Sequence, residues 1–581
     1  MPYRITWLLV LLLSGYISFA QQKDSSPFIK LVQPLKENNS VSTPQQFIIG
    51  STCKGCTIVI NDTPVKVYRT GAFAYEVNLK QKENAFEITA QIDGKKKKKM
   101  VAFSYTTPAA PKSVTDFSIE QVQSFPAGDL MLQPGDMIRF RVKTLTHCKV
   151  MVNGNTPLFE QPDSLTNGIR GIYSGKLIIA STDTFYRQAM TISVQLNDSA
   201  VIYRPTLARF TVMHKDSADV VITKGRLAHL EYGLGEDRLG GAKMGYIDSM
   251  IPLRVIGKVG GDIKVRLSSS RTAYIPDEHV RWMPPGTPYP ASLTGKIRLT
   301  TDSIYDYATL QLFSRLPYQT FHQTDPSRIV VDVYGATNNT NWIDQPEAVK
   351  EIKKITYEQV SDEIFRMNIY LQHEQPWGHS IFYNGNNLVI KVKRPPLTNT
   401  LKGLTIALDA GHGGSNTGAV GATGAIEKDI TLQITRKLKN LLENEGAHII
   451  LTRDKEMFFD NKERILFYRD STPDLLLSIH LNSATDPFRS SGTSTFYRYE
   501  GFRPLSRAIY KRMLELGLKE YGNNGSFNFM LNSPTEYPNA LIETLFLSNL
   551  EEEEKILDPV FQEQMAEKIV QGVRDYLEGA R

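Results

Sequence analysis

Two histidines and two glutamates near the C-terminus have the types and positions that a catalytic metal site requires. His412 follows an apolar run that predicts a strand, and His480 ends a second apolar strand, LLLSIH. Glu427 begins a predicted helix after a glycine-rich loop, and Glu543 lies within the apolar run 540–545. Ligands in open α/β sheets gather at the carboxyl ends of strands. Two imidazoles and one carboxylate form a catalytic zinc set, in which the fourth position stays open to water.

Each of these residues also has a simpler structural explanation. His412 could cap a glycine turn, His480 could be a hydrogen-bonded core histidine, and Glu427 could be an acid favoured by the helix dipole. Asp409 could orient a ligand or close a strand with a turn. Glu543 differs, because a carboxylate inside an apolar strand is costly unless it is paired or used. The combination of these residues, rather than any single one, predicts a site for one zinc ion.

The elements around these residues alternate between strands and helices. Helical periodicity predicts helices over 426–445, 461–469, 504–516 and 559–577. Apolar runs predict strands over 404–409, 447–452, 475–480, 494–499 and 540–545. Such alternation indicates an α/β domain at 400–581, with helices on the faces of a sheet.

The motifs of this region resemble those of the zinc-dependent N-acetylmuramoyl-L-alanine amidases of the type 3 family. They are TIALDAGHGG, GAIEKD, LTR followed by a helix with Arg464, LLLSIHLNS and PNALIETLFLSN, and they span about residues 402–578. The resemblance implies an α/β zinc amidase domain with a mixed sheet flanked by helices. It also implies one Zn²⁺ ion held by His412, Glu427 and His480, with Glu543 as the catalytic residue.

The resemblance implies a reaction as well. Zinc-dependent hydrolysis of the amide between N-acetylmuramic acid and L-alanine in peptidoglycan would release stem peptides, in cell-wall remodelling or daughter-cell separation. The alternative is a non-catalytic peptidoglycan-binding scaffold with the amidase fold, against which the complete four-residue set argues. Asn482 and Arg464 are weaker, substrate-binding candidates, and Arg464 could instead form an ion pair on a helix surface. Some relatives carry a long autoinhibitory helix, for which the 63 residues from His480 to Glu543 leave little room.

The preceding residues predict β modules. Short alternating runs predict an immunoglobulin-like β-sandwich over 21–110 and a β-rich domain of unknown role over 113–215. Residues 216–285, which include GLGEDRLGG, resemble a bacterial SH3-like barrel. Residues 290–395 resemble the wall-targeting module that precedes many secreted amidases. In that module Trp377 and Tyr383 could stack on sugars or lie in the core.

Residues 1–20 have the features of a secretory signal peptide. Arg4 is the positive start, residues 7–13 are apolar, and Ser18 and Ala20 are small residues before the cleavage point. The alternative, a transmembrane anchor, conflicts with the early interruption at Ser14 and Gly15. We therefore expect a bacterial protein secreted across the inner membrane to the periplasm or cell envelope, with no transmembrane segment in the mature chain.

Composition limits the partners and the cross-links. The chain has 581 residues, a net charge of +6 and neither helix-turn-helix nor zinc-finger spacing, so nucleic acid is not an expected partner. Residues 401–581 hold 21 basic and 26 acidic residues, so the excess of positive charge lies in residues 1–400. These basic residues could face an anionic wall polymer, or the uneven distribution could reflect chance. The expected partner is peptidoglycan, and an envelope activator protein is kept open. Of three cysteines, Cys53 and Cys56 could form a local disulfide, which leaves Cys148 over.

Overall fold

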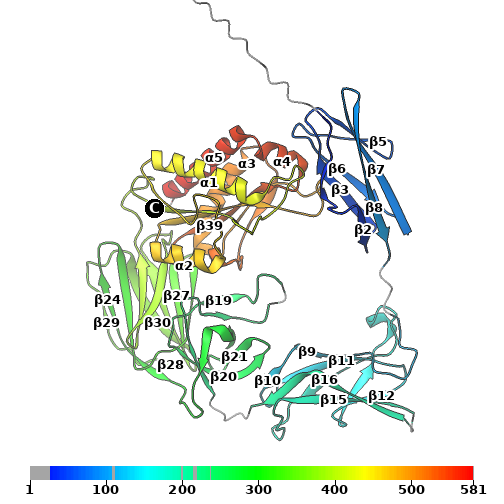
Figure 1. Ribbon diagram of the computed structural model, residues 1–581. Helices are drawn as coiled ribbons and strands as arrows, with labels where there is room; N and C mark the ends of the chain where they lie inside the picture. The colour runs from blue at the N-terminus through cyan, green and yellow to red at the C-terminus, as the bar shows by residue number, and fades with distance from the viewer. Residues whose placement is uncertain are drawn as a thin grey trace, which may run out of the picture. The chain divides into compact units, whose positions relative to one another are not determined.

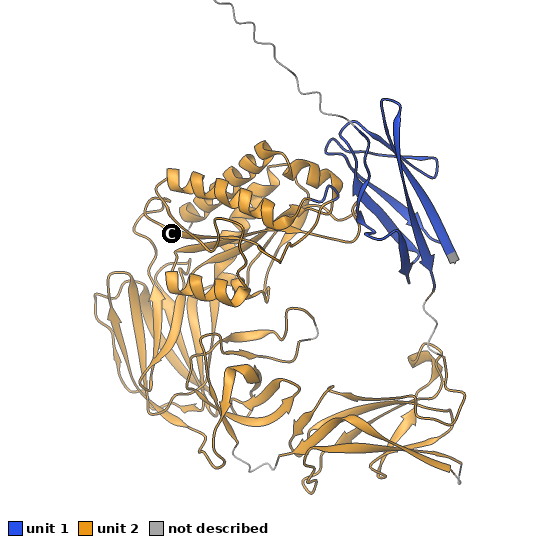
Figure 2. Cartoon of the chain, viewed as in Figure 1, with its two compact units in different colours: residues 1–106, 422–424 blue, residues 107–421, 425–581 orange. Residues whose placement is uncertain are grey.

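The computed structural model describes residues 26–80, 82–107, 112–197, 200–213, 219–235 and 237–579. The chain divides into two compact units, residues 1–106 with 422–424 and the remaining residues (Figure 2). The predicted signal peptide, residues 1–20, lies outside the described residues and stays a prediction. Within the described part of the chain, no helix is long and apolar enough to cross a membrane.

The first unit contains a sandwich of two β-sheets. One sheet has the order β1 (Lys30–Gln33), β3 (Gln45–Ser51), β6 (Ala72–Asn78). The other has the order β2 (Asn38–Val41), β8 (Lys95–Tyr105), β7 (Lys82–Ile92), β4 (Thr57–Ile60), β5 (Thr63–Val65). Alternating apolar residues such as Ile48, Phe73 and Phe103 fill the core. A disulfide joins Cys53 and Cys56, as the sequence suggested.

The strands that follow form one continuous 15-stranded sheet. Strand β10 pairs in parallel with β16 and antiparallel with β20, and so connects the segments predicted as 113–215 and 216–285. Strands β17 to β23, residues 220–282, are called the β17–β23 module below; their assignment as an SH3-like barrel stays a prediction. The strands are β9 (Gln121–Phe125), β10 (Leu130–Leu132), β11 (Met137–Lys143), β12 (Lys149–Val152), β13 (Thr156–Glu160), β14 (Ile172–Ile178), β15 (Gln188–Leu196), β16 (Ala200–Val212), β17 (Val220–Thr223), β18 (His229–Glu231), β19 (Lys243–Tyr246), β20 (Pro252–Val259), β21 (Asp262–Arg266), β22 (Thr272–Pro276) and β23 (Val280–Trp282).

Residues 292–393 form a second two-sheet module. Its sheets have the orders β28 (Ala336–Thr337), β24 (Ser292–Thr301), β25 (Tyr305–Leu312), β33 (Asn387–Lys393), β32 (His379–Asn384) and β26 (Tyr318–Thr324), β27 (Ser327–Tyr334), β31 (Ile364–Leu371), β30 (Ile352–Ser361), with β29 (Ile343–Asp344) beside β24. Trp377 and Tyr383 are only 3% and 7% exposed. Both are therefore core residues, and neither offers a free face to a sugar.

The C-terminal domain contains a mixed six-stranded sheet with helices on both faces (Figure 1). The strand order is β35 (His448–Leu451), β34 (Thr405–Ala410), β36 (Leu475–Asn482), β39 (Asn539–Phe546), β37 (Thr493–Phe496), β38 (Glu520–Asn524). The first four strands are parallel, and β37 is antiparallel to β39. The helices are α1 (Glu427–Asn444), α2 (Asn461–Ser471), α3 (Arg503–Leu514), α4 (Leu550–Ile556) and α5 (Pro559–Gly579).

Alternation along the strands builds two cores, one on each face of this sheet. Ile406 and Leu408 pack in the cluster that includes α1, α3 and α5, whereas the intervening Ala407 packs in the cluster that includes α2. Every predicted helix and strand of this domain is present, with ends that differ by three residues at most. Strand β38 and helix α4 were not predicted, because their sequences, EYGNN and LEEEEKI, lack an apolar periodicity.

Candidate metal centre

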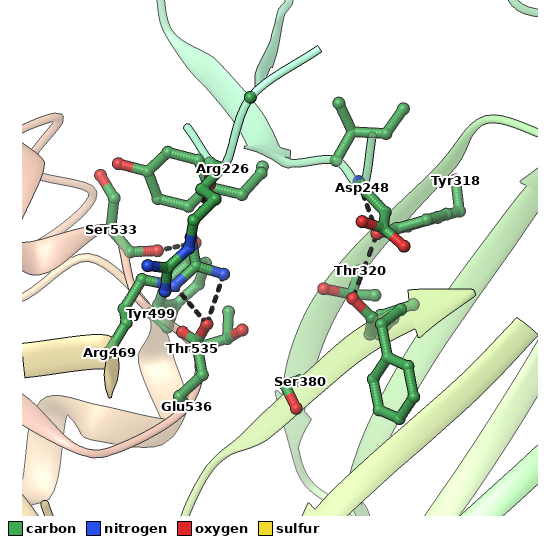
Figure 3. A pocket seen from close by; sticks show the side chains of 16 residues that line it. Arg226, Asp248, Tyr318, Thr320, Ser380, Arg469, Tyr499, Ser533, Thr535 and Glu536 are labelled. Carbon is green, nitrogen blue, oxygen red and sulfur yellow. Dashed lines mark hydrogen bonds and ion pairs between the residues drawn. The ribbon is translucent and has the colours of Figure 1, made fainter. Parts of the chain in front are cut away.

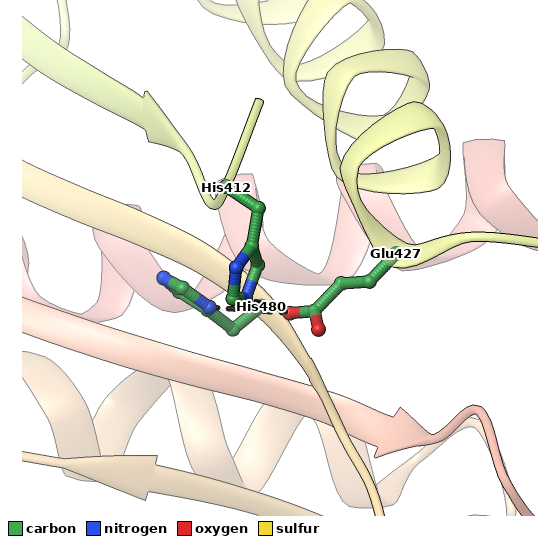
Figure 4. A group of neighbouring side chains, drawn as sticks. All are labelled: His412, Glu427 and His480. Atoms are coloured by element: carbon green, nitrogen blue, oxygen red, sulfur yellow. Dashed lines mark hydrogen bonds and ion pairs between the residues drawn. The ribbon is translucent and has the colours of Figure 1, made fainter. Parts of the chain in front are cut away.

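His412, Glu427 and His480 come together at the carboxyl ends of β34 and β36 (Figure 4). His412 follows β34, His480 belongs to β36, and Glu427 is the first residue of α1. One ligand atom from each residue lies within 4.8 Å of the others. Glu427 Oε1 is 3.1 Å from His412 Nε2 and 3.2 Å from His480 Nδ1. His448, the third histidine of the domain, is exposed at the start of β35 and is not part of this group.

Main-chain and neighbouring groups hold the three side chains in this arrangement. The buried Glu427 accepts hydrogen bonds from the backbone N–H groups of Leu481 to Oε1 and Ala419 to Oε2, at 2.9 and 2.8 Å. His412 Nδ1 lies 2.9 Å from Asn416 Oδ1, which leaves Nε2 directed at Glu427. Partners of this kind fix the ring orientation of a metal-ligating histidine.

Gly418 allows the loop before α1 to pass closely over this group. A Cβ atom at Gly418 would lie 2.4 Å from Glu427 Oε2 and 2.7 Å from His412 Cδ2, and its φ of +67° also favours glycine. We predict that Gly418→Ala displaces Glu427 and weakens zinc binding by about 10–100-fold, as loss of a supporting contact typically does. Competition with a chromophoric chelator measures the affinity. Gly403→Ala is the matched control, because Gly403 also has a positive φ (+83°) but open space around its Cβ position; equal losses in both variants would contradict the contact argument.

The electrostatics of the group suit a cation. Burial acts to raise the pKa of Glu427, but its hydrogen bonds with His412 and His480 outweigh burial and hold that pKa well below the usual range. Burial likewise acts to lower the pKa of His480, while the bond to Glu427 and the charge of Glu543 raise it overall. An ionised carboxylate with two imidazole nitrogens is a nitrogen-and-oxygen donor set of catalytic zinc sites. These residues therefore fit a zinc ion.

Glu543 lies on β39 directly beside His480 in the parallel pairing of β36 and β39. Its Oε2 atom is buried and has no hydrogen-bond partner among the described residues. Burial raises the pKa of Glu543 to about 7, although the nearby His480 acts in the opposite direction. A buried carboxylate without a partner is costly for folding, and such groups concentrate at functional sites.

Arg464 is buried rather than exposed on the surface of α2. It is 2% exposed, and its Nη1 donates hydrogen bonds to Asp409 Oδ1 at 2.5 Å and to the Ala410 carbonyl at 2.9 Å. It also donates to the carbonyl of His412, while Ser478 Oγ donates to Asp409 Oδ2 at 2.7 Å. Arg464 thus connects the strand end to the loop that carries His412. No observation tests the prediction that Arg464 contacts the substrate.

A cavity of about 600 Å³ opens over the His/Glu group. Its lining includes Asn482 and Arg464, the two substrate-binding candidates from the sequence. It also includes Arg238, Leu239 and Lys243, which belong to the β17–β23 module. Sequence reasoning did not connect these three with the site, because more than 160 residues separate them from His412. The only available signal was the unusual glycine-rich motif GLGEDRLGG.

A second cavity, of about 230 Å³, shares no lining residue with the cavity over the His/Glu group. Figure 3 shows the side chains that line it. It is lined by residues of the β17–β23 module, of the module at 292–393 and of the C-terminal domain. Arg469 forms an ion pair with Glu536 at 2.7 Å, and Arg226 forms another with Asp470. The Arg226–Asp470 ion pair connects the β17–β23 module to the C-terminal domain. Because these charged groups already have partners, the cavity does not suggest chemistry.

Comparison with known proteins decides the family. Residues 406–575 match the family described as N-acetylmuramoyl-L-alanine amidase (Amidase_3), and residues 296–394 match the AMIN domain. The uncharacterized protein YqiI of Bacillus subtilis is 33% identical over 181 residues, which are 30% of this chain and 86% of that protein. The chain belongs to the N-acetylmuramoyl-L-alanine amidase family. The resemblance inferred from the motifs is confirmed, and the AMIN match falls within the predicted module at 290–395.

Other amidases extend the comparison. The probable cell wall amidase LytH of Staphylococcus epidermidis is 30% identical over 192 residues, which are 33% of this chain and 64% of LytH. The chain thus spans less than two thirds of LytH. The N-acetylmuramoyl-L-alanine amidase AmiC of Escherichia coli is 25% identical over 370 residues, 48% of this chain and 88% of AmiC. A solved amidase from Clostridium difficile 630 is 32% identical and covers 31% of this chain and 98% of its own, with a TM-score of 0.30.

Proposed function

We propose that this chain hydrolyses the amide bond between the lactyl group of N-acetylmuramic acid and L-alanine in peptidoglycan. The observation that carries the proposal is the convergence of His412, Glu427 and His480 beside the unpartnered carboxylate of Glu543. In this proposal the first three residues hold one zinc ion and Glu543 is the catalytic acid and base. Membership of the amidase family supports the choice of substrate.

The chain's own residues would perform the following chemistry. Zinc bound by the three ligands would supply Lewis acidity, which polarises a carbonyl oxygen and makes water more acidic. Glu543 takes a proton from the attacking water as the new C–O bond forms, and returns it to the alanine nitrogen as the C–N bond breaks. Glu543 suits both transfers because its Oε2 atom has no hydrogen-bond partner among the described residues and can therefore accept the proton and then donate it. Glu427 and the two histidines keep their geometry throughout.

Removal of the metal should abolish the reaction. We predict that a chelator reduces the release of stem peptides from peptidoglycan at least about 100-fold, because the Lewis acid is lost. Added Zn²⁺ should restore the rate and Mg²⁺ should not, since Mg²⁺ prefers oxygen ligands in octahedral geometry. Mass spectrometry of the products measures the effect. Cleavage that persists in the chelated, metal-free protein would contradict zinc dependence.

The same assay separates the enzyme from a non-catalytic scaffold. Free stem peptides with an unmodified L-alanine amine, together with intact glycan strands, support amide hydrolysis. Retention of peptidoglycan by the zinc-loaded protein without any released peptide would instead support a scaffold that uses the amidase fold. The complete donor set and the catalytic glutamate favour the enzyme, since a scaffold has no use for an unpaired buried carboxylate.

The proposed place of action is outside the cytoplasm, at the cell wall. The match to an AMIN domain beside the amidase domain supports this proposal. The periplasm, the signal peptide and an envelope activator protein stay predictions from the sequence. Expression of the full chain with a C-terminal reporter, followed by cell fractionation, would test the location.

A further inference from the structure

The turn between β18 and β19 of the β17–β23 module is attached to the amidase domain through its backbone. Asn528 Nδ2 donates hydrogen bonds to the carbonyls of Leu239 and Gly241, at 3.0 and 2.8 Å. Asn528 Oδ1 accepts from the backbone N–H of Lys243 at 3.2 Å. Arg498 binds the same region, because its guanidinium donates both to Asn528 Oδ1 and to the Lys243 carbonyl. The turn is therefore held by side chains of the amidase domain that serve few other partners.

A close backbone approach at Gly241 fixes the conformation of this turn. A Cβ atom at Gly241 would lie 2.2 Å from the carbonyl oxygen of Gly233 and 2.3 Å from Glu231 Oε2. Only glycine permits this close closure of residues 237–243 against the strand that precedes them. The second part of GLGEDRLGG and the two residues that follow it thereby place Arg238 and Lys243 at the cavity wall.

Arg238 and Lys243 are two cations that no described carboxylate contacts directly, although the charge of Glu231 acts on Lys243 from a distance. Neither side chain forms an ion pair or a hydrogen bond with any described residue. The backbone of Lys243 and of Leu239, next to Arg238, is hydrogen-bonded to Asn528 and Arg498. Arg238 is exposed and Lys243 is half-buried. Arg238 lies near enough to the catalytic Glu543 for its charge to act on that carboxyl. Two unpaired cations at the wall of an active-site cavity favour an anionic ligand.

We propose that Arg238 and Lys243 form a carboxylate-binding subsite that recognises an acidic residue of the peptide beyond the scissile L-alanine. This inference rests on the proposed amidase function and deepens it. The β17–β23 module then contributes directly to substrate selection, and Asn528 positions its turn. Arginine suits the role because its planar donors match a carboxylate in two parallel hydrogen bonds, while lysine adds a point charge.

The test compares the full zinc-loaded chain with three variants on two small probes. The probes are N-acetylmuramoyl-L-alanyl-D-glutamate with free carboxylates and the same compound with both carboxylates amidated. For the free acid we expect the double variant Arg238→Gln, Lys243→Gln to raise KM about tenfold with kcat within about twofold, the loss expected for a charge-assisted hydrogen bond. Asn528→Ala should also raise KM, because it releases the turn. Arg281→Gln, which removes an exposed cation elsewhere in the module, should change neither parameter.

The amidated probe separates charge recognition from a structural effect. With this probe the wild type should show the raised KM, and the double variant should show no further change. An unchanged KM of the double variant for the free acid would overturn the subsite while the amidase function stands. If the wild type cleaves neither probe, release of stem peptides from peptidoglycan decides the proposed function. Calorimetric titration of the zinc-loaded wild type and double variant with the free-acid probe then decides the subsite. A Kd for the free-acid probe that is about tenfold weaker in the double variant would support the subsite, and equal Kd values in the two proteins would overturn the subsite.

Discussion

Glu543→Gln should reduce the hydrolysis of peptidoglycan about 1,000-fold, within the usual range for loss of a general acid and base. The amide of glutamine has nearly the shape of the carboxylate but cannot accept the proton of the attacking water. Because Glu543 Oε2 has no hydrogen-bond partner among the described residues, the substitution breaks no hydrogen bond of that atom and should not lower stability. The initial rate of stem-peptide release, measured by mass spectrometry, gives the effect.

Two further measurements make this result specific. The variant should still bind one equivalent of zinc, because His412, Glu427 and His480 keep their positions. Glu520→Gln, at an exposed position on β38 of the same sheet, is the matched control and should retain full activity. A Glu543→Gln protein that retains zinc and works within tenfold of the wild type would show that another group moves the proton.

Arg464→Met should lower the stability of the amidase domain by about 3–5 kcal/mol, the typical loss when one partner of a buried ion pair is removed. Asp409 is 1% exposed, and burial opposes its charge. The Arg464 guanidinium outweighs burial and holds the pKa of Asp409 below its usual value. Without Arg464, a buried negative charge loses its partner, and the loop of His412 loses a donor. Hydrogen exchange at β34 and β36 in the full chain reports the loss locally.

A charge-matched comparison tests this explanation. Arg574→Met removes an ion pair with Glu445 whose side chains are 49% and 32% exposed, and it should cost less than about 1 kcal/mol. Asp409→Asn in the Arg464→Met background should recover part of the lost protection, because the unpaired charge disappears. If Arg464→Met and Arg574→Met had equal effects, burial of the ion pair would not be the cause.

Local patterns predicted the amidase domain well, because its elements are encoded by nearby residues. The apolar spacing over 426–445 predicted α1, which spans Glu427–Asn444. The apolar run 475–480 predicted β36, although the strand extends to Asn482. The glycines and histidines of TIALDAGHGG stand where a strand ends, so their place at the sheet edge also followed from the order of residues. Strand β38 and helix α4 escaped prediction because packing, rather than periodicity, stabilises their polar sequences.

Residue types and spacing were enough to predict the four residues of the candidate site and the alternation that brings strand ends together. Tertiary structure decided which groups surround them. Arg464 became the buried partner of Asp409, although its helix spacing also suited a surface ion pair. Arg238 and Lys243 reached the cavity from a module more than 160 residues away. Periodicity reports which face of an element is buried, but a contact between distant segments depends on how several elements pack, and no local pattern records it.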